Sequence, residues 1–291
     1  MPELPEVESV ARGLRVHLVG RTISGVETSS LMTIETTSCS GTQNLKGATV
    51  RSVRRKGKTL FIELRRSGPF QETKFLLWNL GMTGQLVFTT SDSPVLDHTH
   101  VRLRLDNGPN ELRYRDVRRF GRIRWYGPQE SKKVLSSLGP DAARIRATTF
   151  EKLLEGRRGA IKSLLLNQRV LSGLGNIYAD ESLFDARIHP LTPAGCLPRL
   201  KVRALHEGVR QILRRAIRAG GTSFRDYVNA TGNPGWFQVK LLVYGQTGKD
   251  CHRCGISIQK IVVGGRGSHF CPECQQLPPG SDSHKILREN S

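Results

Sequence analysis

The sequence lacks the features that mark membrane and secreted proteins. Hydrophobic residues make up 37% of its 291 residues, and no run approaches the ~18 apolar residues that a membrane-spanning helix requires. The N-terminus carries Glu3, Glu6 and Glu8 and no basic region followed by an apolar run, so we expect no signal peptide. Six cysteines are too few for a disulfide scaffold in a chain of this length. These absences favour a cytoplasmic protein that has no membrane partner.

Acidic residues are also scarce relative to basic ones. The chain has 45 Lys and Arg against 25 Asp and Glu, a formal net charge of +20, which favours nucleic acid over an anionic membrane as partner. Two runs are especially basic: Arg51, Arg54, Arg55, Lys56 and Lys58, and then Arg113, Arg115, Arg118, Arg119, Arg122 and Arg124. Such runs are often solvated surfaces. Because Phe120 lies inside the second run, and an apolar side chain beside arginines can wedge between stacked bases, we favour a groove that follows phosphates.

The length predicts about two domains, and the residue pattern changes along the chain. One amphipathic helix comes first, with apolar residues at Val7, Val10, Leu14 and Leu18. Short strand-like runs separated by turns follow it, at 49–53, 59–64, 74–78, 85–88, 100–105 and 111–114. The polar segment 28–44 predicts a loop or a weak hairpin. From 148 to about 228 the pattern is helical, and Gly220-Gly221 ends a long helix over 200–219.

Two Cys-x-x-Cys pairs give the strongest local signal. They are Cys251 with Cys254, and Cys271 with Cys274. A redox thiol pair or a set of buried free cysteines are alternatives, but four thiolates at this spacing favour one structural zinc ion with no open position for catalysis. The zinc would replace a core that a unit of this size is too small to build. Cys39 and Cys196 are predicted to be isolated thiols.

The sequence between the cysteine pairs predicts a β-hairpin. A strand over 256–263, a Gly-rich tip over 264–267 and a returning strand fit the pattern. Arg266 at this tip would be held rigidly outward, or it is simply one more surface arginine. Earlier in the chain, Gly173-Leu174-Gly175 precedes a helix start and could present backbone N–H groups to a DNA phosphate, although a tight turn between helices gives the same pattern.

The N-terminus offers a further chemical possibility. Removal of Met1 would leave Pro2 with a free secondary amine, which can attack a sugar carbon and form an iminium. Glu3 is adjacent and could donate or accept a proton. Proline is also a common second residue, so this feature is weak when taken alone.

Taken together, these motifs resemble the bacterial formamidopyrimidine-DNA glycosylase family. The matching segments follow the family order: MPELPEVE at 1–8, RKGK at 55–58, LGMTG at 80–84, RRFG at 118–121, residues 173–181 and the four-cysteine hairpin. The resemblance covers about 2–275. It implies a bifunctional DNA glycosylase and AP lyase of base excision repair, which removes oxidised purines such as 8-oxoguanine and formamidopyrimidines and cleaves the strand by β,δ-elimination.

The same resemblance implies an α+β fold and a domain order. The expected parts are an N-terminal β-sandwich with a leading helix (1–138), a linker (139–147), a helix–two-turns–helix domain with a lesion loop (148–249), a four-cysteine zinc finger (250–276) and a disordered tail (277–291). DNA would lie in the cleft between the halves. The implied partner is double-stranded DNA with oxidised bases or abasic sites, bound by a monomer in the bacterial cytoplasm and at its nucleoid.

Roles for individual residues follow from the resemblance. Pro2 is implied as the nucleophile at C1′ and Glu3 as the catalytic acid, with Lys58 and Arg266 transferring protons in the elimination steps. Three further residues, Met82, Arg118 and Phe120, would fill the gap that the flipped base leaves. They would also hold the cytosine that has lost its pairing partner. Contacts to phosphates or to the lesion strand are implied for His98, Arg118, Arg157, Lys162, Asn176 and Asn79.

The remaining implied residues are acidic groups and a loop. Glu6 and Glu181 resemble acidic members of the family site. A loop that closes over the flipped base is implied at Thr222, Ser223, Phe224, Arg225, Asp226 and Tyr227. Asn79 stands where the family often has His, so its phosphate contact cannot become cationic.

Two other functions remain open from the sequence. A zinc-containing protein that only binds damaged or abasic DNA would share the basic surface and the hairpin, but it would not need Pro2, Glu3, Lys58 and Arg266 together. An oxidised-pyrimidine glycosylase on the same fold, similar to endonuclease VIII, is the second. Leu4, where that sister family typically has Gly, and the Gly220-Gly221-Thr222 segment favour the purine branch.

Overall fold

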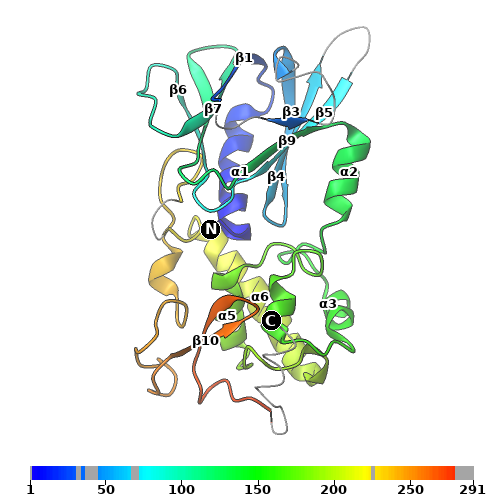
Figure 1. Cartoon of the computed structure of the whole chain (residues 1–291), viewed down its shortest axis with the longest axis vertical. Coiled ribbons are helices and arrows are strands. Elements are labelled where there is room, and N and C mark those ends of the chain that lie inside the picture. Colours follow the sequence, from blue (N-terminus) through cyan, green and yellow to red (C-terminus); the bar gives the residue numbers. More distant parts are fainter. Residues whose placement is uncertain (1, 31–33, 37–44, 67–71, 224–226, 279–291) are drawn as a thin grey trace. The chain divides into compact units, whose positions relative to one another are not determined.

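The computed structural model describes residues 2–30, 34–36, 45–66, 72–223 and 227–278. Its contacts divide the chain into two compact units (Figure 1). Unit 1 comprises 1–137 and 217–238, and unit 2 comprises 138–216 and 239–291. None of the helices in the described part is long and apolar enough to cross a membrane.

Unit 1 is built from two sheets and the leading helix α1 (Leu4–Leu18). The first sheet has the strand order β1 (Ile23–Thr28), β7 (Thr99–Leu105), β8 (Asn110–Arg115) and β6 (Gln85–Thr90). The second has the order β2 (Glu35–Thr36), β9 (Arg122–Tyr126), β5 (Glu72–Asn79), β4 (Thr59–Arg66) and β3 (Ala48–Lys56). All neighbours are antiparallel except β2 and β9, which are parallel. This arrangement confirms the predicted sandwich with a leading helix.

The core of unit 1 lies where α1 and both sheets bury their apolar faces. Val7, Val10, Leu14 and Leu18 of α1 are all buried, as their period predicts. In β7, the buried side chains of Val101, Leu103 and Leu105 alternate with the more exposed Arg102 and Arg104. The predicted apolar and basic faces of this strand are therefore confirmed.

Three elements of unit 1 were missed, each because its apolar signal is weak. In β9, Arg122 and Arg124 alternate with the buried Ile123 and Trp125, so a strand was hidden inside an arginine-rich run. Helix α2 (Pro128–Ser136) buries Ser131 alone and has no apolar face to recognise. Strand β1 contains Gly25 at an irregularity in its pairing with β7. The predicted segment 28–44 lies mostly outside the described residues; in its described part, Thr28 ends β1, and Glu35 and Thr36 form β2.

Unit 2 contains the predicted helices and the hairpin. The helices are α3 (Ala147–Leu154), α4 (Ile161–Leu166), α5 (Asn176–Asp185) and α6 (Arg199–Arg218), with short turns η2 (Ala194–Cys196) and η3 (Phe237–Lys240). Helix α6 ends just before Gly220 and Gly221, whose φ angles are +75° and +89°. Strands β10 (Gln259–Val263) and β11 (Arg266–Phe270) form the hairpin, whose turn is Gly264-Gly265.

The segment 217–238 packs with unit 1, whereas the sequence assignment placed it in the helical domain. Tyr227 and Ala230 belong to the buried core of the sandwich. The Phe88 amide on β6 donates a hydrogen bond to the Ala230 carbonyl at 2.8 Å. This segment therefore follows the helices in sequence but packs on the first sheet of unit 1, through its edge strand β6.

Candidate functional site

The N-terminal residues are tied to the segment that follows α6 by the carboxylate of Glu6. Pro2 and Glu3 are buried and precede α1 directly. Glu6 Oε2 accepts a hydrogen bond from the Glu3 amide at 2.7 Å, and Glu6 Oε1 accepts one from the Thr222 amide at 2.7 Å. Glu6 is buried, and its carbonyl accepts a hydrogen bond from Tyr227 Oη at 3.2 Å. Glu6 is thus a structural link between Glu3 and both described ends of the implied lesion loop, whose residues 224–226 lie outside the described part.

A second tie holds the turn that carries Lys58. This residue follows Gly57 in the tight turn between β3 and β4, and it is half-buried. Arg55 donates to Glu8 Oε2 on α1 at 2.9 Å and to the Gly57 carbonyl at 3.0 Å. Although burial opposes it, Arg55 together with Arg12 lowers the pKa of Glu8, so the carboxylate stays ionised. The Lys58 turn is therefore fixed to the helix that begins beside Pro2 and Glu3.

Met82, Arg118 and Phe120, which the resemblance implies would fill the gap left by a flipped base, come together in two connections between strands. Met82 lies in the β5–β6 connection, and Arg118 and Phe120 lie in the β8–β9 connection. The Arg118 guanidinium lies 4.5 Å from the centre of the Phe120 ring, and Arg118 Nη1 is 3.6 Å from Met82 Sδ. Met82 is 38% exposed and Phe120 is 52% exposed. Two apolar side chains joined by a guanidinium are thus presented to solvent.

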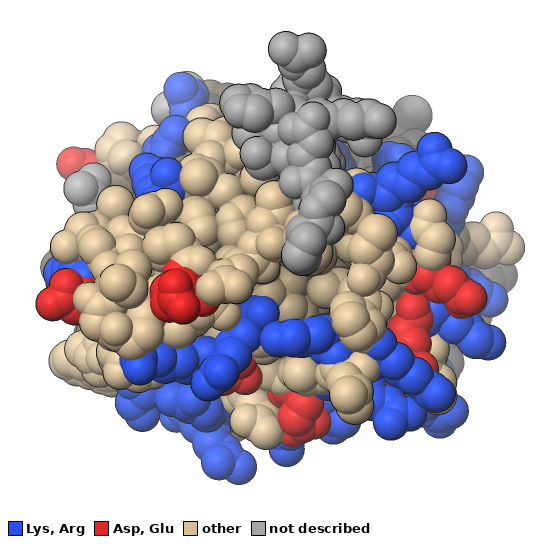
Figure 2. Space-filling model, turned by 90° about the horizontal axis from the view of Figure 1, so that it is seen from below, with Lys and Arg blue, Asp and Glu red and all other residues tan. Residues whose placement is uncertain are grey.

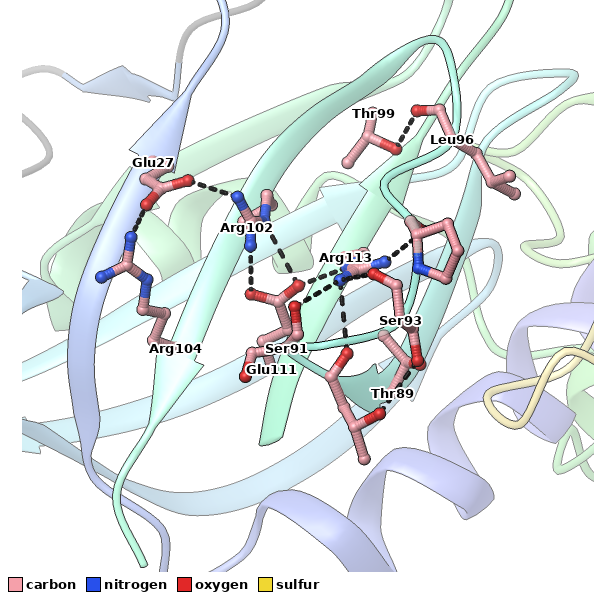
Figure 3. A network of polar contacts seen from close by, with 12 residues as sticks. Glu27, Thr89, Ser91, Ser93, Leu96, Thr99, Arg102, Arg104, Glu111 and Arg113 are labelled. Atoms are coloured by element: carbon pink, nitrogen blue, oxygen red, sulfur yellow. Dashed lines mark hydrogen bonds and ion pairs between the residues drawn. The ribbon is translucent and has the colours of Figure 1, made fainter. Parts of the chain in front are cut away.

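The predicted phosphate contacts in unit 1 are exposed. Asn79 ends β5, and His98 lies in the β6–β7 loop with φ at +65°. This loop is held by Arg113, which donates to the carbonyls of Pro94 at 2.7 Å and Ser93 at 2.8 Å (Figure 3). Arg113 is buried and also pairs with Glu111. Arg113 is therefore a structural residue, which corrects the reading of the whole arginine run 113–124 as a surface for phosphates.

Lys162 differs from the expectation of a direct DNA contact. Its side chain is 0% exposed, and its ammonium lies 2.5 Å from Asp180 Oδ1 on α5. It also donates to the Gly267 carbonyl of β11 at 3.1 Å, and Asn176 Nδ2 donates to the same carbonyl at 2.8 Å. Since an enclosed ammonium cannot reach a phosphate, the structure makes Lys162 a support for the strand that begins with Arg266.

Arg266 opens β11 beside the hairpin turn and is exposed, as predicted. Asp180 stabilises the same strand two residues further along, because its Oδ2 accepts hydrogen bonds from the backbone and the ring of His269 at 2.9 and 3.1 Å. Asp180, which the sequence reasoning missed, therefore connects α4, α5 and the hairpin. The available signal was its place in the motif 173–181, four residues after Asn176, where α5 begins.

Glu181 also has a structural position. It is buried, and its carboxylate accepts hydrogen bonds from the amides of Leu242, Val243 and Tyr244 at distances from 2.9 to 3.1 Å. Burial raises its pKa against the lowering effect of these bonds. Glu181 therefore fixes the chain that enters the four-cysteine segment, rather than facing solvent.

Basic side chains do reach the surface of unit 2. Arg157 and Arg158 are exposed and line an open depression of about 600 Å³. Figure 2 shows one face of the molecule, on which Lys and Arg gather in a band while Asp and Glu form separate patches. Basic charge is thus displayed on this face of the molecule (Figure 2), and the exposed Arg157 is accessible to a polyanion.

The four cysteines form a compact group at the base of the hairpin. The donor sulfurs of Cys251, Cys254, Cys271 and Cys274 all lie within 4.8 Å of one another. The Sγ–Sγ distance is 3.9 Å between Cys251 and Cys274, and 3.4 Å between Cys254 and Cys271. A tetrahedral zinc ion with Zn–S bonds of about 2.3 Å sets its sulfurs about 3.8 Å apart, so the donor set fits zinc. Cys196 is exposed and outside this group.

The comparisons with known proteins match this architecture part by part. The model of the formamidopyrimidine-DNA glycosylase N-terminal domain matches residues 1–123, that of the H2TH domain matches 138–228, and that of the zinc finger found in FPG and IleRS matches 248–277. The third match, together with the sulfur geometry, confirms the prediction of one structural zinc ion held by the four cysteines.

Whole-chain relatives agree. A formamidopyrimidine-DNA glycosylase from Enterococcus faecalis is 42% identical over 282 residues, which cover 95% of this chain and 98% of the relative. One from Brevibacillus brevis is also 42% identical, and the match covers 95% and 99%. The structure of the Lactococcus lactis Fpg with DNA containing an abasic site is similar with a TM-score of 0.83 and 36% identity, covering 94% of this chain and 100% of that one. The chain belongs to the formamidopyrimidine-DNA glycosylase family.

Proposed function

We propose that this protein is a bifunctional DNA glycosylase and AP lyase that removes oxidised purines from double-stranded DNA during base excision repair. The observation that carries the proposal is the anchoring of Glu3 and of the Lys58 turn on one helix, α1. Glu6 holds the Glu3 amide, and Arg55 joins Glu8 to the Lys58 turn. A protein that only binds DNA has no use for an N-terminal Pro-Glu pair held in this way.

The proposed chemistry starts at the N-terminus. After loss of Met1, the neutral Pro2 nitrogen attacks C1′ and the bond from C1′ to the base breaks, while the proton that the Pro2 nitrogen loses passes to the departing base. Glu3 donates a proton to the ring oxygen of the sugar, the bond from this oxygen to C1′ breaks, and an iminium forms between Pro2 and C1′. The resulting iminium draws electrons from the sugar. Loss of a proton from C2′ then expels the 3′ phosphate, and a second elimination expels the 5′ phosphate. Lys58 and Arg266 assist these proton and phosphate steps.

DNA binding is proposed to use the exposed residues of both units. Asn79, His98 and Arg157 are accessible for phosphate contacts. Met82, Arg118 and Phe120 would fill the gap left by the flipped base, which offsets part of the lost stacking. Because the substrate is chromosomal DNA, we also propose that the protein works in the bacterial cytoplasm at the nucleoid.

Glu3→Gln tests this proposal by separating its two steps. We expect excision of 8-oxoguanine to fall at least about a hundredfold, because general acid–base catalysis contributes roughly 10²–10⁴-fold. Cleavage of a ready-made abasic site should be retained in part, since an abasic sugar has a ring-opened aldehyde form with which Pro2 can react without a proton from Glu3 for ring opening. Single-turnover cleavage and borohydride trapping on both substrates measure this. Equal loss on the two substrates would contradict the role of Glu3, and trapping on neither substrate by the unmodified protein would favour a protein that only binds DNA.

A further inference from the structure

A buried carboxylate lies between the two connections that carry Met82, Arg118 and Phe120. Asp116 is 0% exposed. Its Oδ1 accepts a hydrogen bond from Thr83 Oγ1 at 2.5 Å, and its Oδ2 accepts bonds from the Gly121 amide at 2.8 Å and from Tyr114 Oη at 3.0 Å. Thr83 belongs to the β5–β6 connection and Gly121 to the β8–β9 connection. One carboxylate therefore joins both connections.

The hydrogen bonds continue from this carboxylate to the backbone beside the exposed side chains. Thr83 Oγ1 donates to Asp116 and accepts a hydrogen bond from the Arg118 amide at 3.1 Å. Thr83 is the neighbour of Met82, and Gly121 is the neighbour of Phe120. Each of the three exposed side chains is thus on, or next to, a residue that Asp116 holds directly or through Thr83.

Tyr114 makes this arrangement rigid. It is fully buried, and burial together with the adjacent Asp116 carboxylate raises its pKa, so its phenol stays protonated and continues to donate. A Cβ added at Gly84 or Gly121 would collide with Tyr114 Oη. A Cβ at Gly81, whose φ is +65°, would lie 2.5 Å from the Gly121 amide nitrogen. The two connections are therefore in backbone contact around the Tyr114–Asp116 pair.

The backbone between two of the exposed side chains is strained. Arg119 lies in the left-handed region with φ at +54°, which disfavours any residue with a Cβ. Its amide donates to the Asp116 carbonyl at 3.3 Å. Such a conformation persists when its surroundings determine it. Here it lies between Arg118 and Phe120, whose side chains meet with the guanidinium over the ring.

We propose that Asp116 is a positioning residue that holds Met82, Arg118 and Phe120 in place before DNA arrives, so that they can enter the base stack without first being ordered. This inference rests on the proposed function. It predicts a particular defect in a variant: the chemistry at C1′ is retained, but flipping of a base out of a paired duplex is slower. Preorganisation of contact residues lowers the ordering cost that binding must overcome.

Asp116→Asn tests the inference. The amide keeps the shape of the carboxylate but loses its charge, and its NH2 group is a donor that must face one of the three groups that now donate to Asp116, which are Thr83 Oγ1, Tyr114 Oη and the Gly121 amide. Single-turnover excision is measured for 8-oxoguanine in a fully paired duplex and for the same lesion in an unpaired loop, with cleavage of a ready-made abasic site alongside. We expect excision from the paired duplex to fall about tenfold or more, a typical effect for one charge-assisted hydrogen bond. Excision from the unpaired loop and abasic cleavage should fall less than about threefold.

Glu111→Gln is the matched control. Glu111 is also 0% exposed and lies near the start of β8, five residues from Asp116, but it pairs with Arg102 on β7 and with Arg113 on β8 (Figure 3). It should destabilise unit 1 in thermal unfolding without changing the ratio of excision between paired and unpaired lesions. If Asp116→Asn does not fold, Thr83→Val removes both the bond from Thr83 to Asp116 and the relay to the Arg118 amide, but leaves the bonds of Asp116 to Gly121 and Tyr114. It should therefore give the same ratio change in a milder form.

The outcomes separate this inference from the proposed function. An unchanged ratio in both Asp116→Asn and Thr83→Val, or an equal ratio change in Glu111→Gln, would overturn the positioning role while leaving the glycosylase intact. Failure of the unmodified protein to excise the lesion from either DNA would instead overturn the proposed function.

Discussion

The two units hold their candidate functional residues by different means. In unit 1, the buried carboxylates of Glu6 and Asp116 accept hydrogen bonds from backbone amides and hydroxyls, and the groups they hold rest on the large core of the sandwich. In unit 2, the strand that begins with Arg266 is held by the Lys162–Asp180 pair and by a four-cysteine site. The hairpin shares only small clusters of buried residues with its neighbours in unit 2, so we expect its geometry to depend on metal and on a buried ion pair. The groups that Glu6 and Asp116 hold in unit 1 should depend on neither.

Removal of the metal should give the largest difference between the units. Cys251→Ser leaves three thiolates, and because structural zinc binding contributes roughly 10–16 kcal/mol in small zinc units, the hairpin should lose its order. We expect the loss of one zinc per chain by metal analysis, weaker DNA binding and loss of strand cleavage, with the thermal unfolding of the sandwich retained.

The exposed Cys196 provides the control for this change. Cys196→Ser should keep both the zinc and the cleavage activity. Unfolding of both units together in Cys251→Ser would break the comparison, because it would mean that the sandwich also relies on the zinc site.

The buried ion pair should give the next largest effect. Lys162→Met leaves Asp180 as an uncompensated buried charge, which typically costs about 3–5 kcal/mol, and Asp180→Asn in the same chain should recover part of that loss. Chemical unfolding of unit 2 measures the change. Lys152→Met, on the exposed face of α3, is the control and should cost little.

The salt dependence of DNA binding separates support from direct contact. Each phosphate contact contributes about 0.9 to the slope of log K against log salt. We expect Lys162→Met to weaken binding without changing this slope. A slope reduced by about one would show that Lys162 reaches a phosphate, and the enclosed position would then be wrong for the bound state.

A smaller, pH-dependent effect is expected at His189 in unit 2. Burial lowers its pKa to about 4, and its Nδ1 accepts a hydrogen bond from the Leu191 amide at 3.1 Å, which requires a neutral ring. The unfolded chain takes up a proton below about pH 6.5 and the folded one does not, so stability should fall by about 1–3 kcal/mol as the pH drops from 6.5 to 4. His189→Asn, whose Oδ1 can accept the same bond, should flatten this part of the pH profile. If His189→Asn leaves the stability profile between pH 6.5 and 4 unchanged, groups other than His189 cause the pH dependence of unit 2.

Sequence reasoning reached the features that depend on local pattern or spacing. The period of α1, the alternation in β7 and the spacing of the four cysteines each follow from geometry within a few residues. It did not reach the roles of Asp116 and Lys162, because these depend on contacts between distant segments. Lys162 donates to Gly267, 105 residues away, and nothing near Lys162 in the sequence distinguishes a buried lysine from an exposed one. Charge can be counted from a sequence, but burial is decided by the fold.

The central claim is that the amine of Pro2 forms the covalent bond to DNA. The most direct measurement is borohydride trapping on DNA with an abasic site, followed by peptide mapping of the linked residue by mass spectrometry. We predict that the adduct lies on Pro2 in protein that has lost Met1, and that protein with a blocked N-terminus forms no trapped complex. An adduct on Lys58, or a trapped complex formed by the blocked protein, would contradict the claim.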